Sequence, residues 1–577
     1  MRHFFIVFLL LTGLVFLAHC QPTPANGIVD EPEPPLTVGL IYDSAAQWVD
    51  SVYSGLSESE RIAQLFWLAV EQPDNGTSFE LLKGQVAKHQ PGGILLFRMS
   101  PQRAVGVIET LQSVSKLPLL VSIDGEWGLG MRMPEVRSFP YAMTLGAIQD
   151  DSLIYRMGLE IARQFSVLGI HVNMAPVADV NSNPNNPVIG HRSFGELPDH
   201  VARKSVAYMK GLQDGGVMAV GKHFPGHGDT STDSHKTLPV VHHSRELLDS
   251  TDLVPFKAMI DAGLWGIMTA HVEVPSLDNR RGLPASFSDS VVTGLLRQQL
   301  GFNGLVITDA VNMQGAKTMG PPGKVDVLAL AAGNDIVEFT EDLAGGIAAV
   351  QKALADSLMT RANLEDKCRR ALAFKYWLTR HPSPSKMNKQ NLDSLLNAPS
   401  ALDLNQQLSD AALTVLVNDH MLPMVGVPGE YACIVVGQAP VIALQMQQQG
   451  LPVYQLSTSD PAAFDRVLQS MEPYPGYVVV IADSQWGRRA VNHSGRNQLI
   501  RLAAQHPSLV VFMGNAYHLS PWRGLEKASG LVISYQNSRE AQQAVLKLLN
   551  GEIGANGRLP VSVKNWFEAG SGIVVSE

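Results

Sequence analysis

Residues 217–224 read VMAVGKHF, an apolar run that ends in a lysine and a histidine. A near-continuous apolar run of this length is typical of a parallel strand that is buried on both faces. Stretches that read as amphipathic helices separate this run from its neighbours along the chain. Seven more runs of the same kind lie between residues 64 and 339: QLFWLAV (64–70), GGILLFR (92–98), PLLVSID (118–124), HVNMAPV (171–177), GIMTAHV (266–272), GLVITDA (304–310) and NDIVEF (334–339).

Eight apolar runs that alternate with helical stretches over roughly 300 residues predict an α/β fold, a TIM-type (β/α)8 barrel. We place this N-terminal barrel at residues 41–385, where the helical stretch 341–380 closes the unit. A doubly wound open sheet shows the same alternation of strands and helices, so it is the alternative that the pattern leaves open.

A second alternating pattern follows a polar linker at residues 386–409. It predicts a smaller C-terminal α/β sandwich domain at residues 410–577, with five or six parallel-type strands. No group of catalytic residues stands out in this domain, so packing or support of the barrel is its expected role. The apolar runs that define it are LTVLV, ACIVVG, YVVVIA, LVVFMG and GLVISY.

The composition describes a globular chain and excludes some classes of partner. Hydrophobic residues make up 45% of the 577 residues and charged residues 17%, as in folded soluble domains. The net charge of -9 argues against nucleic acid, whose binding needs a basic surface. With only three cysteines, neither a disulfide framework nor a cysteine-rich metal site is expected.

The N-terminus reads as a targeting segment. Residues 1–20 combine a short basic start with the apolar run FFIVFLLLTGLVFLA, which has the length of a signal peptide. Cys20 lies where a bacterial lipoprotein signal places its lipidated cysteine, although His19 replaces the small residue that usually precedes it. A Pro-rich tether at 21–40 follows. We expect export to the periplasm of a bacterium or attachment to its membrane by a lipid anchor, with simple secretion as the alternative.

Charged and titratable residues follow the apolar runs at the places where a barrel has its active site. In a (β/α)8 barrel that site lies at the C-terminal ends of the strands. Turns and helix caps also require polar residues there, but Asp, Lys and His at four separate strand ends exceed what turns need. The residues are Asp124, Lys222, His223, His271 and Asp309.

The loop GKHFPGHGDTSTDSH, residues 221–235, contains the densest group of titratable residues in the chain. Pro225 interrupts regular structure there. Asp233 lies two residues before His235, and a carboxylate that close can hold one imidazole nitrogen and raise the basicity of the other. An imidazole pKa of about 6.5 already suits proton transfer at neutral pH. The alternatives to a proton-transfer pair are a solvated loop and a metal site that includes Asp229.

Asp309 ends the seventh apolar run, so its carboxylate would project into the mouth of the barrel from a rigid strand. A fixed carboxylate that faces a proton donor is what glycosidic cleavage with retention of configuration requires. Taken alone, the Asp-x-His pattern fits a solvated loop better.

The motifs together resemble the β-N-acetylhexosaminidase branch of glycoside hydrolase family 3. The stretch KHFPGHGDTSTDSHKTLP looks like the signature of that branch. The resemblance continues in IDGEWGLGMR, in NPVIGHRSFG and in GLVITDAVNMQGA, and covers roughly residues 45–380. NGRLPVSV near the end of the chain resembles the close of the family's α/β sandwich domain.

The resemblance implies a role for each matched residue and implies no cofactor or metal. Asp309 matches the catalytic nucleophile, and His235 matches the acid/base that Asp233 orients. The residues that hold the hydroxyls of a terminal N-acetylglucosamine are matched by Asp124, Arg192, Lys222 and His223. Met313, which follows the nucleophile, would form an apolar wall.

The expected activity is that of an exported, retaining exo-β-N-acetylglucosaminidase acting on peptidoglycan fragments or chitin-type oligosaccharides. Trp127 stands where many relatives have glycine, and an aromatic ring there could stack on a sugar face, which leaves the preferred aglycone open. Three alternatives remain: a β-glucosidase of the same family, a β-N-acetylglucosaminide phosphorylase, and a non-catalytic sugar-binding protein of the surface. The sequence does not indicate an oligomeric state.

Overall fold

The computed structural model describes residues 37–71, 76–233, 237–380, 391–424, 430–456, 466–467, 469–470, 474–483 and 495–576. The predicted signal peptide, Cys20 and most of the predicted tether lie outside these residues, as does His235. No helix in the part of the chain described is long and apolar enough to cross a membrane.

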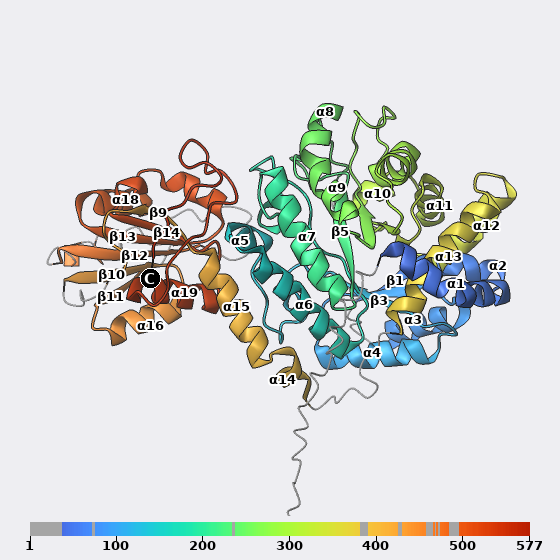
Figure 1. The fold of residues 1–577 in the computed structure, drawn as a ribbon, viewed down its shortest axis with the longest axis horizontal. Coiled ribbons are helices and arrows are strands. Elements are labelled where there is room, and N and C mark those ends of the chain that lie inside the picture. Colours follow the sequence, from blue (N-terminus) through green and yellow to red (C-terminus); the bar gives the residue numbers. More distant parts are fainter. Residues whose placement is uncertain are drawn as a thin grey trace, which may run out of the picture. The chain divides into compact units, whose positions relative to one another are not determined.

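Each of the eight apolar runs forms a parallel strand of one sheet (Figure 1). Neighbouring strands pair in the order β7-β6-β5-β4-β3-β2-β1-β8. A parallel bridge between Ile307 and Ile336 joins the two outer strands and closes the ring, which confirms the predicted barrel. The strands are β1 (Phe66–Val70), β2 (Gly93–Leu96), β3 (Leu120–Ile123), β4 (Val172–Asn173), β5 (Met218–Phe224), β6 (Gly266–Thr269), β7 (Leu305–Thr308) and β8 (Val337–Glu338).

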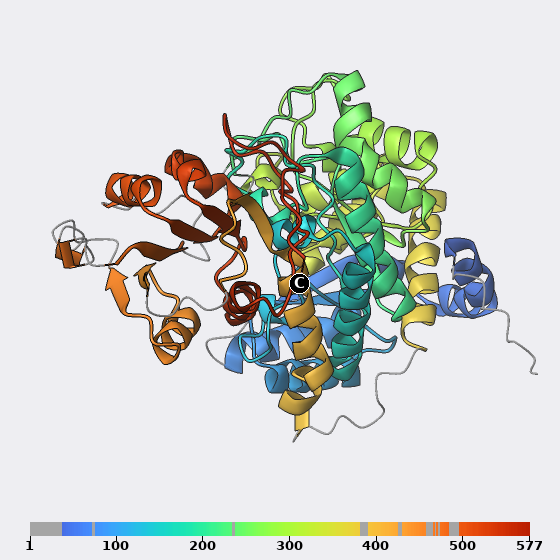
Figure 2. The ribbon, with the colours of Figure 1, turned by 60° about the vertical axis from the view of Figure 1, so that its left-hand side comes forward.

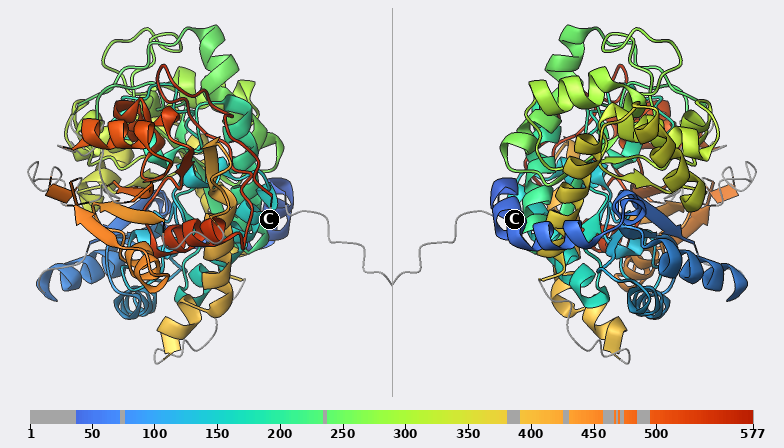
Figure 3. Two further views of the ribbon diagram at one scale, coloured as in Figure 1. Left: turned by 90° about the vertical axis from the view of Figure 1, so that its left-hand side faces the viewer. Right: turned by 90° about the vertical axis from the view of Figure 1, so that its right-hand side faces the viewer.

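Helices surround the barrel, and local sequence signals set their ends. Ser57 and Glu60 form a capping box at the start of α2, and Gly169 ends α6 in the left-handed conformation. Helix α1, which precedes the first strand, packs on α13 (Figure 3). The helices of this part are α1 (Val38–Gly55), α2 (Glu58–Ala63), α3 (Gly76–His89), α4 (Pro101–Ser113), α5 (Ala142–Ala147), α6 (Asp151–Leu168), α7 (Pro198–Asp214), α8 (Arg245–Leu247), α9 (Leu253–Asp261), α10 (Gln314–Lys317), α11 (Pro322–Ala332), α12 (Leu343–Ala355) and α13 (Arg361–Leu378), with a π-type helix at Ser290–Gln299.

The C-terminal domain contains a six-stranded sheet in the order β11-β10-β12-β13-β14-β9. Five strands are parallel, but β9 runs antiparallel to β14, so the expectation of parallel strands throughout is wrong for this edge. Its strands are β9 (Thr414–Asn418), β10 (Tyr431–Val436), β11 (Val453–Leu456), β12 (Gly476–Ala482), β13 (Ser508–Met513) and β14 (Gly530–Ile533). Its helices include α16 (Pro440–Gln448), α18 (Arg496–Gln505) and α19 (Arg539–Asn550).

The stretch predicted as a polar linker is largely helical where it is described. It forms α14 (Leu392–Leu396) and the first part of α15 (Pro399–Ala412). Helix α15 packs on α5 and α6 of the barrel and on α19 of the C-terminal domain (Figure 2). Hydrogen bonds also join the two domains: the side-chain oxygen of Gln536 accepts from the Tyr141 amide at 3.0 Å and from the Thr144 hydroxyl at 2.9 Å.

Candidate active site

A cavity of about 1160 Å³ lies at the C-terminal ends of the barrel strands. This volume exceeds the usual range for a pocket that holds one small ligand, about 300–1,000 Å³. Strand β3 is followed by Asp124, β5 contains Lys222 and His223, β7 is followed by Asp309, and β8 ends in Glu338; all five line the cavity. The structure therefore brings four of the predicted strand-end residues, Asp124, Lys222, His223 and Asp309, together in one site, and it adds Glu338. The fifth, His271, is fully buried behind the carbonyl of Asp309 and does not line the cavity.

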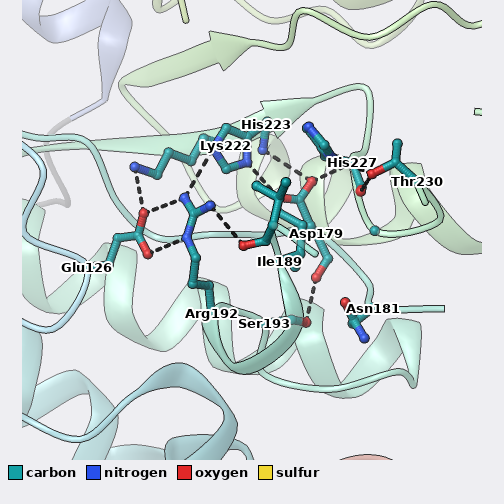
Figure 4. A network of polar contacts seen from close by, with 12 residues as sticks. Glu126, Asp179, Asn181, Ile189, Arg192, Ser193, Lys222, His223, His227 and Thr230 are labelled. Carbon is teal, nitrogen blue, oxygen red and sulfur yellow. Dashed lines mark hydrogen bonds and ion pairs between the residues drawn. The ribbon is translucent and has the colours of Figure 1, made fainter. Parts of the chain in front are cut away.

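Alternating carboxylates and cations form the wall of the cavity (Figure 4). The Lys222 ammonium lies 2.8 Å from an oxygen of Asp124 and 2.9 Å from one of Glu126. Arg192 donates to both oxygens of Glu126, at 2.6 and 2.9 Å, and Arg132 donates to Asp124 at 2.6 Å. This network holds the carboxylates in fixed positions, because a bidentate guanidinium and two further cations leave them little freedom.

The same network keeps the two acids ionised. Burial alone would raise the pKa of Asp124, but Lys222 and Arg132 outweigh burial and lower that pKa to about 2. Burial would likewise raise the pKa of Glu126, and Arg192 and Lys222 hold it well below its ordinary value. The side chain of Asp124 is 18% exposed, so part of the carboxylate stays accessible to a ligand. A carboxylate has about four acceptor sites, which leaves some for sugar hydroxyls.

Asp179, on the loop after β4, holds His223 from behind. The Nδ1 of His223 lies 2.6 Å from Asp179, whose other oxygen accepts from the backbone amide of His227 at 2.8 Å. Because Asp179 can accept the Nδ1 proton, it orients the ring, and the other ring nitrogen lies 3.4 Å from Arg192. This buried carboxylate thus fixes the orientation of a predicted substrate-binding residue.

Asp309 extends from the end of β7 into the cavity and is partly exposed there. One carboxylate oxygen accepts from the Ala310 amide at 2.8 Å. Burial would raise the pKa of Asp309, but the His223 and His271 imidazoles, this amide and Lys222 together lower it. The carboxylate is therefore ionised at neutral pH, and the Ala310 amide holds one of its oxygens, which suits a nucleophile.

Amide side chains of the β4 loop hold the histidine-rich loop after β5. Asn186 donates to the carbonyl oxygens of His227 and Gly228, and Asn183 donates to those of Asp229 and Thr230. Burial lowers the pKa of His227 to about 4, so this imidazole is neutral. The loop can be followed as far as Asp233, whose carbonyl accepts from the Thr237 amide at 3.0 Å. Asp233 does not line the cavity as described, and the placement of His235 is not described.

Two predicted apolar neighbours line the cavity, Met313 and Trp127. The indole is only 6% exposed, and its ring packs edge-on against Tyr141 at 4.8 Å between centroids. Little of the ring is therefore open to a ligand that would stack on it. No three His, Cys, Asp or Glu residues in the ranges described lie close enough to hold a metal ion.

The C-terminal domain also contributes to the cavity, which the sequence analysis missed. Asn515, Tyr517 and His518 line it, and the Tyr517 hydroxyl accepts from the Asn181 amide of the barrel at 2.7 Å. The Nδ1 of His518 lies 2.5 Å from Asp483, and both side chains are buried. A second Asp–His pair thus faces the same cavity from the other domain.

Several residues of the site escaped sequence analysis for different reasons. Glu126 and Arg132 are part of IDGEWGLGMR, and a search for charge partners of Asp124 within that motif would have found them. Glu338 is a charge at the end of an apolar run, the same signal that identified Asp309. Asp179 and His518 carry no local signal, because only tertiary contacts place Asp179 behind His223 and His518 at the cavity.

A (β/α)8 barrel whose strand ends place ionised carboxylates, cations and histidines around one cavity defines a class of barrel proteins with a site for a polar ligand. Residues 59–374, more than half of the chain, match the glycosyl hydrolase family 3 N terminal domain. The chain belongs to glycosyl hydrolase family 3, which confirms the resemblance seen in its motifs.

Curated relatives and solved structures agree with this assignment. A protein of Pseudoalteromonas piscicida named beta-hexosaminidase A is 35% identical over 368 residues, 59% of this chain and 61% of that protein. A beta-hexosaminidase of Neisseria meningitidis serogroup C is 36% identical over 257 residues, 43% of this chain and 70% of the relative. The chain thus spans less than two thirds of the P. piscicida relative.

Among solved structures, a glycoside hydrolase family 3 beta-N-acetylglucosaminidase from Paenibacillus sp. str. FPU-7 matches with a TM-score of 0.73 at 27% identity. The match covers 88% of this chain and 99% of that structure. A beta-glucoside phosphorylase matches with a TM-score of 0.76 at 21% identity, over 90% of this chain and 96% of that one, which shows a shared fold alone.

Proposed function

We propose that the protein is a retaining exo-β-N-acetylglucosaminidase that removes terminal β-linked N-acetylglucosamine by way of a covalent glycosyl-enzyme. The observation that carries this proposal is Asp309, an ionised carboxylate at a strand end that lines one cavity together with the cation–carboxylate network. The names of the curated relatives and the Paenibacillus structure support the choice of sugar.

The cation–carboxylate network would hold the terminal sugar. Asp124 accepts from sugar hydroxyls with the lone pairs that Lys222 and Arg132 leave free, while Lys222 and Arg192 donate. His223 contributes the ring nitrogen that Asp179 does not bind. These contacts orient the anomeric carbon towards Asp309, and positioning of this kind supplies much of the rate enhancement.

Two displacements complete the reaction. The His235 imidazolium protonates the glycosidic oxygen as the bond from that oxygen to the anomeric carbon breaks, and an oxygen of Asp309 forms the new bond to the same carbon. Neutral His235 then removes a proton from water, which attacks the anomeric carbon and releases Asp309 as a carboxylate. Asp233, two residues before His235, would orient the imidazole, as the sequence resemblance implies.

We further propose that the natural substrates are peptidoglycan fragments or chitin-type oligosaccharides and that the protein is exported. The support for export is the apolar segment within residues 1–20, with Cys20 as the candidate lipid attachment point in a bacterial periplasm. Globomycin-type inhibition of lipoprotein processing, followed by a shift in mass of the mature protein, would test lipidation of Cys20.

Turnover of 4-nitrophenyl N-acetyl-β-glucosaminide by the wild type and by His235→Ala tests the function. We expect activity in the wild type and a sharp loss in the variant, with a smaller loss for a leaving group that needs no protonation. Turnover of the matching glucoside alone would identify a β-glucosidase instead. Sugar 1-phosphate formed in phosphate buffer would identify a phosphorylase. The absence of turnover with any of these substrates would favour a sugar-binding protein.

A further inference from the structure

Glu338 is a carboxyl group of the cavity to which the catalytic scheme gives no role. It ends β8, lies at 2% exposure and lines the same cavity as Asp124 and Asp309. Its backbone is tied to the end of β7: the amide donates to the Thr308 hydroxyl at 3.0 Å, and the carbonyl accepts from Val311 at 3.0 Å. The backbone position from which the Glu338 side chain extends is therefore fixed beside Asp309.

One oxygen of the Glu338 carboxyl group lacks a donor among the residues that the structure describes. This oxygen, Oε1, is buried. Asp124 and Glu126 differ in this respect, because each is paired with two cations. A buried carboxylate without donors is costly, and protonation is the ordinary way to avoid that cost.

Burial and two neighbouring carboxylates outweigh the cations that face Glu338. Burial raises the pKa of Glu338 well above its ordinary value, and the carboxylates Asp124 and Asp309 raise it further. Lys222 and Arg132 lower it, but both cations are already bonded to Asp124. Glu71, which follows β1 and lines the same cavity, is a further acid on this side. A third carboxylate beside Asp124 and Asp309 would meet repulsion from both.

We propose that Glu338 is a neutral carboxylic acid that donates a hydrogen bond to an oxygen of the terminal sugar in the cavity. This role rests on the proposed function. It adds a binding residue that can donate a hydrogen bond only while its carboxyl group is protonated. A neutral acid supplies a donor where Asp124 and Asp309 supply only acceptors. It also keeps the charge near Asp309 low, so that the nucleophile remains ionised.

Two substitutions separate a donor from an acceptor at this position. Glu338→Gln keeps the shape and a donating amide, so it should lower kcat/KM by less than about tenfold, whereas Glu338→Ala should lower it roughly 100-fold. Asp326→Asn is the matched control, because Asp326 is also a buried acid whose pKa is raised but does not line the cavity. We expect this control to keep the turnover and the pH profile of the wild type.

The pH dependence tells donation apart from a merely structural role. With an activated leaving group that needs no acid, kcat/KM of the wild type should fall as rising pH ionises Glu338, and Glu338→Gln should lose this alkaline fall. The dissociation constant of N-acetylglucosamine should show the same contrast in calorimetry. If affinity for N-acetylglucosamine and for glucose drops equally in Glu338→Ala, the acceptor is a ring hydroxyl; a loss confined to the former identifies the acetamide oxygen.

An infrared difference spectrum of the wild type minus Glu338→Gln tests protonation without any substrate. We expect the carbonyl band of a protonated carboxyl group at neutral pH. If sugar binds but this band is absent, or if the Gln variant is as impaired as the Ala variant, the role of Glu338 is overturned. The proposed function itself would then still stand. A wild type that shows the band but neither binds nor cleaves the N-acetylglucosaminide would overturn the proposed function together with the sugar contact.

Discussion

At the scale of single residues, a buried carboxylate behind the site controls an imidazole within it. Asp179 is fully buried and is bonded to the Nδ1 of His223 and to the amide of His227. Burial would raise the pKa of Asp179, but the imidazoles of His223 and His227 and their hydrogen bonds lower it. The orientation of His223 therefore depends on a residue that never meets the sugar.

Asp179→Asn should lower kcat/KM roughly 10- to 100-fold, because an amide cannot both keep the backbone contacts and accept the Nδ1 proton reliably. Steady-state kinetics with the aryl N-acetylglucosaminide measures the loss, and circular dichroism establishes that the variant is folded. An unchanged kcat/KM would show that the orientation of His223 does not depend on this carboxylate.

Asp326 predicts a pH dependence of stability. Burial raises its pKa from 3.8 to about 7, with one oxygen accepting from Thr340 at 3.1 Å and the other unpartnered among the residues described. A raised folded-state pKa means that the stabilisation is complete below the unfolded pKa and is lost as pH rises through the folded one. Relative to Asp326→Asn, the wild type should lose stability between about pH 4 and pH 7. Urea unfolding across that range checks this, and parallel curves would contradict it.

At the scale of elements, the loop after β5 is held by a close backbone contact. A Cβ atom at Gly228 would lie 1.7 Å from the carbonyl oxygen of Val180, which belongs to the β4 loop. Asn183 and Asn186 bind the same segment, so the two loops form one unit. Any side chain at this position must push apart the loop that leads to Asp233 and His235.

Gly228→Ala should lower turnover of substrates with a poor leaving group at least tenfold, and lower it less for an activated leaving group, because displacement of the loop impairs proton donation first. Gly106→Ala is the control: a Cβ there meets nothing within 4 Å, and the helix should gain up to about 1 kcal/mol. Equal losses on both substrates would show that the loop affects sugar binding instead.

The elements also show what the sequence can and cannot predict. All eight barrel strands were visible, because burial on both faces gives continuous apolar runs, and so were most of the charges at their ends, though not Glu338. The antiparallel direction of β9 was not visible, since an apolar run carries no information on direction. The sequence could not predict the role of Asp179 either, because that role arises from a contact with His223, 44 residues further along the chain.

At the scale of the whole molecule, the cavity belongs to both domains. The sequence analysis expected packing or support from the C-terminal domain and could not predict its part in the cavity, since no motif marked His518 and its partner Asp483 is 35 residues away. In the proposed function the terminal sugar binds at the strand ends of the barrel, so the C-terminal residues that line the cavity would meet the remainder of a longer substrate. The resemblance to a known family predicts Asp309 as the nucleophile, but it does not predict that residues of the C-terminal domain line the cavity.

His518→Ala should raise KM for a chitin-type disaccharide roughly tenfold and change kcat/KM for the aryl glycoside much less, because a small aryl group fills less of the cavity. Kinetics on the two substrates, with tryptophan fluorescence to monitor folding, measures the difference. The same change on both substrates would place His518 with the terminal sugar instead of the leaving group.

The most direct test of the account is to trap the covalent intermediate. With an activated N-acetyl-β-glucosaminide, His235→Ala should form the glycosyl-enzyme but hydrolyse it slowly, since the base that activates water is missing. Mass spectrometry of the quenched protein should then show one added N-acetylglucosaminyl group, on the peptide that contains Asp309. Turnover without any adduct, or an adduct on another carboxylate, would contradict the assignment of Asp309 as the nucleophile.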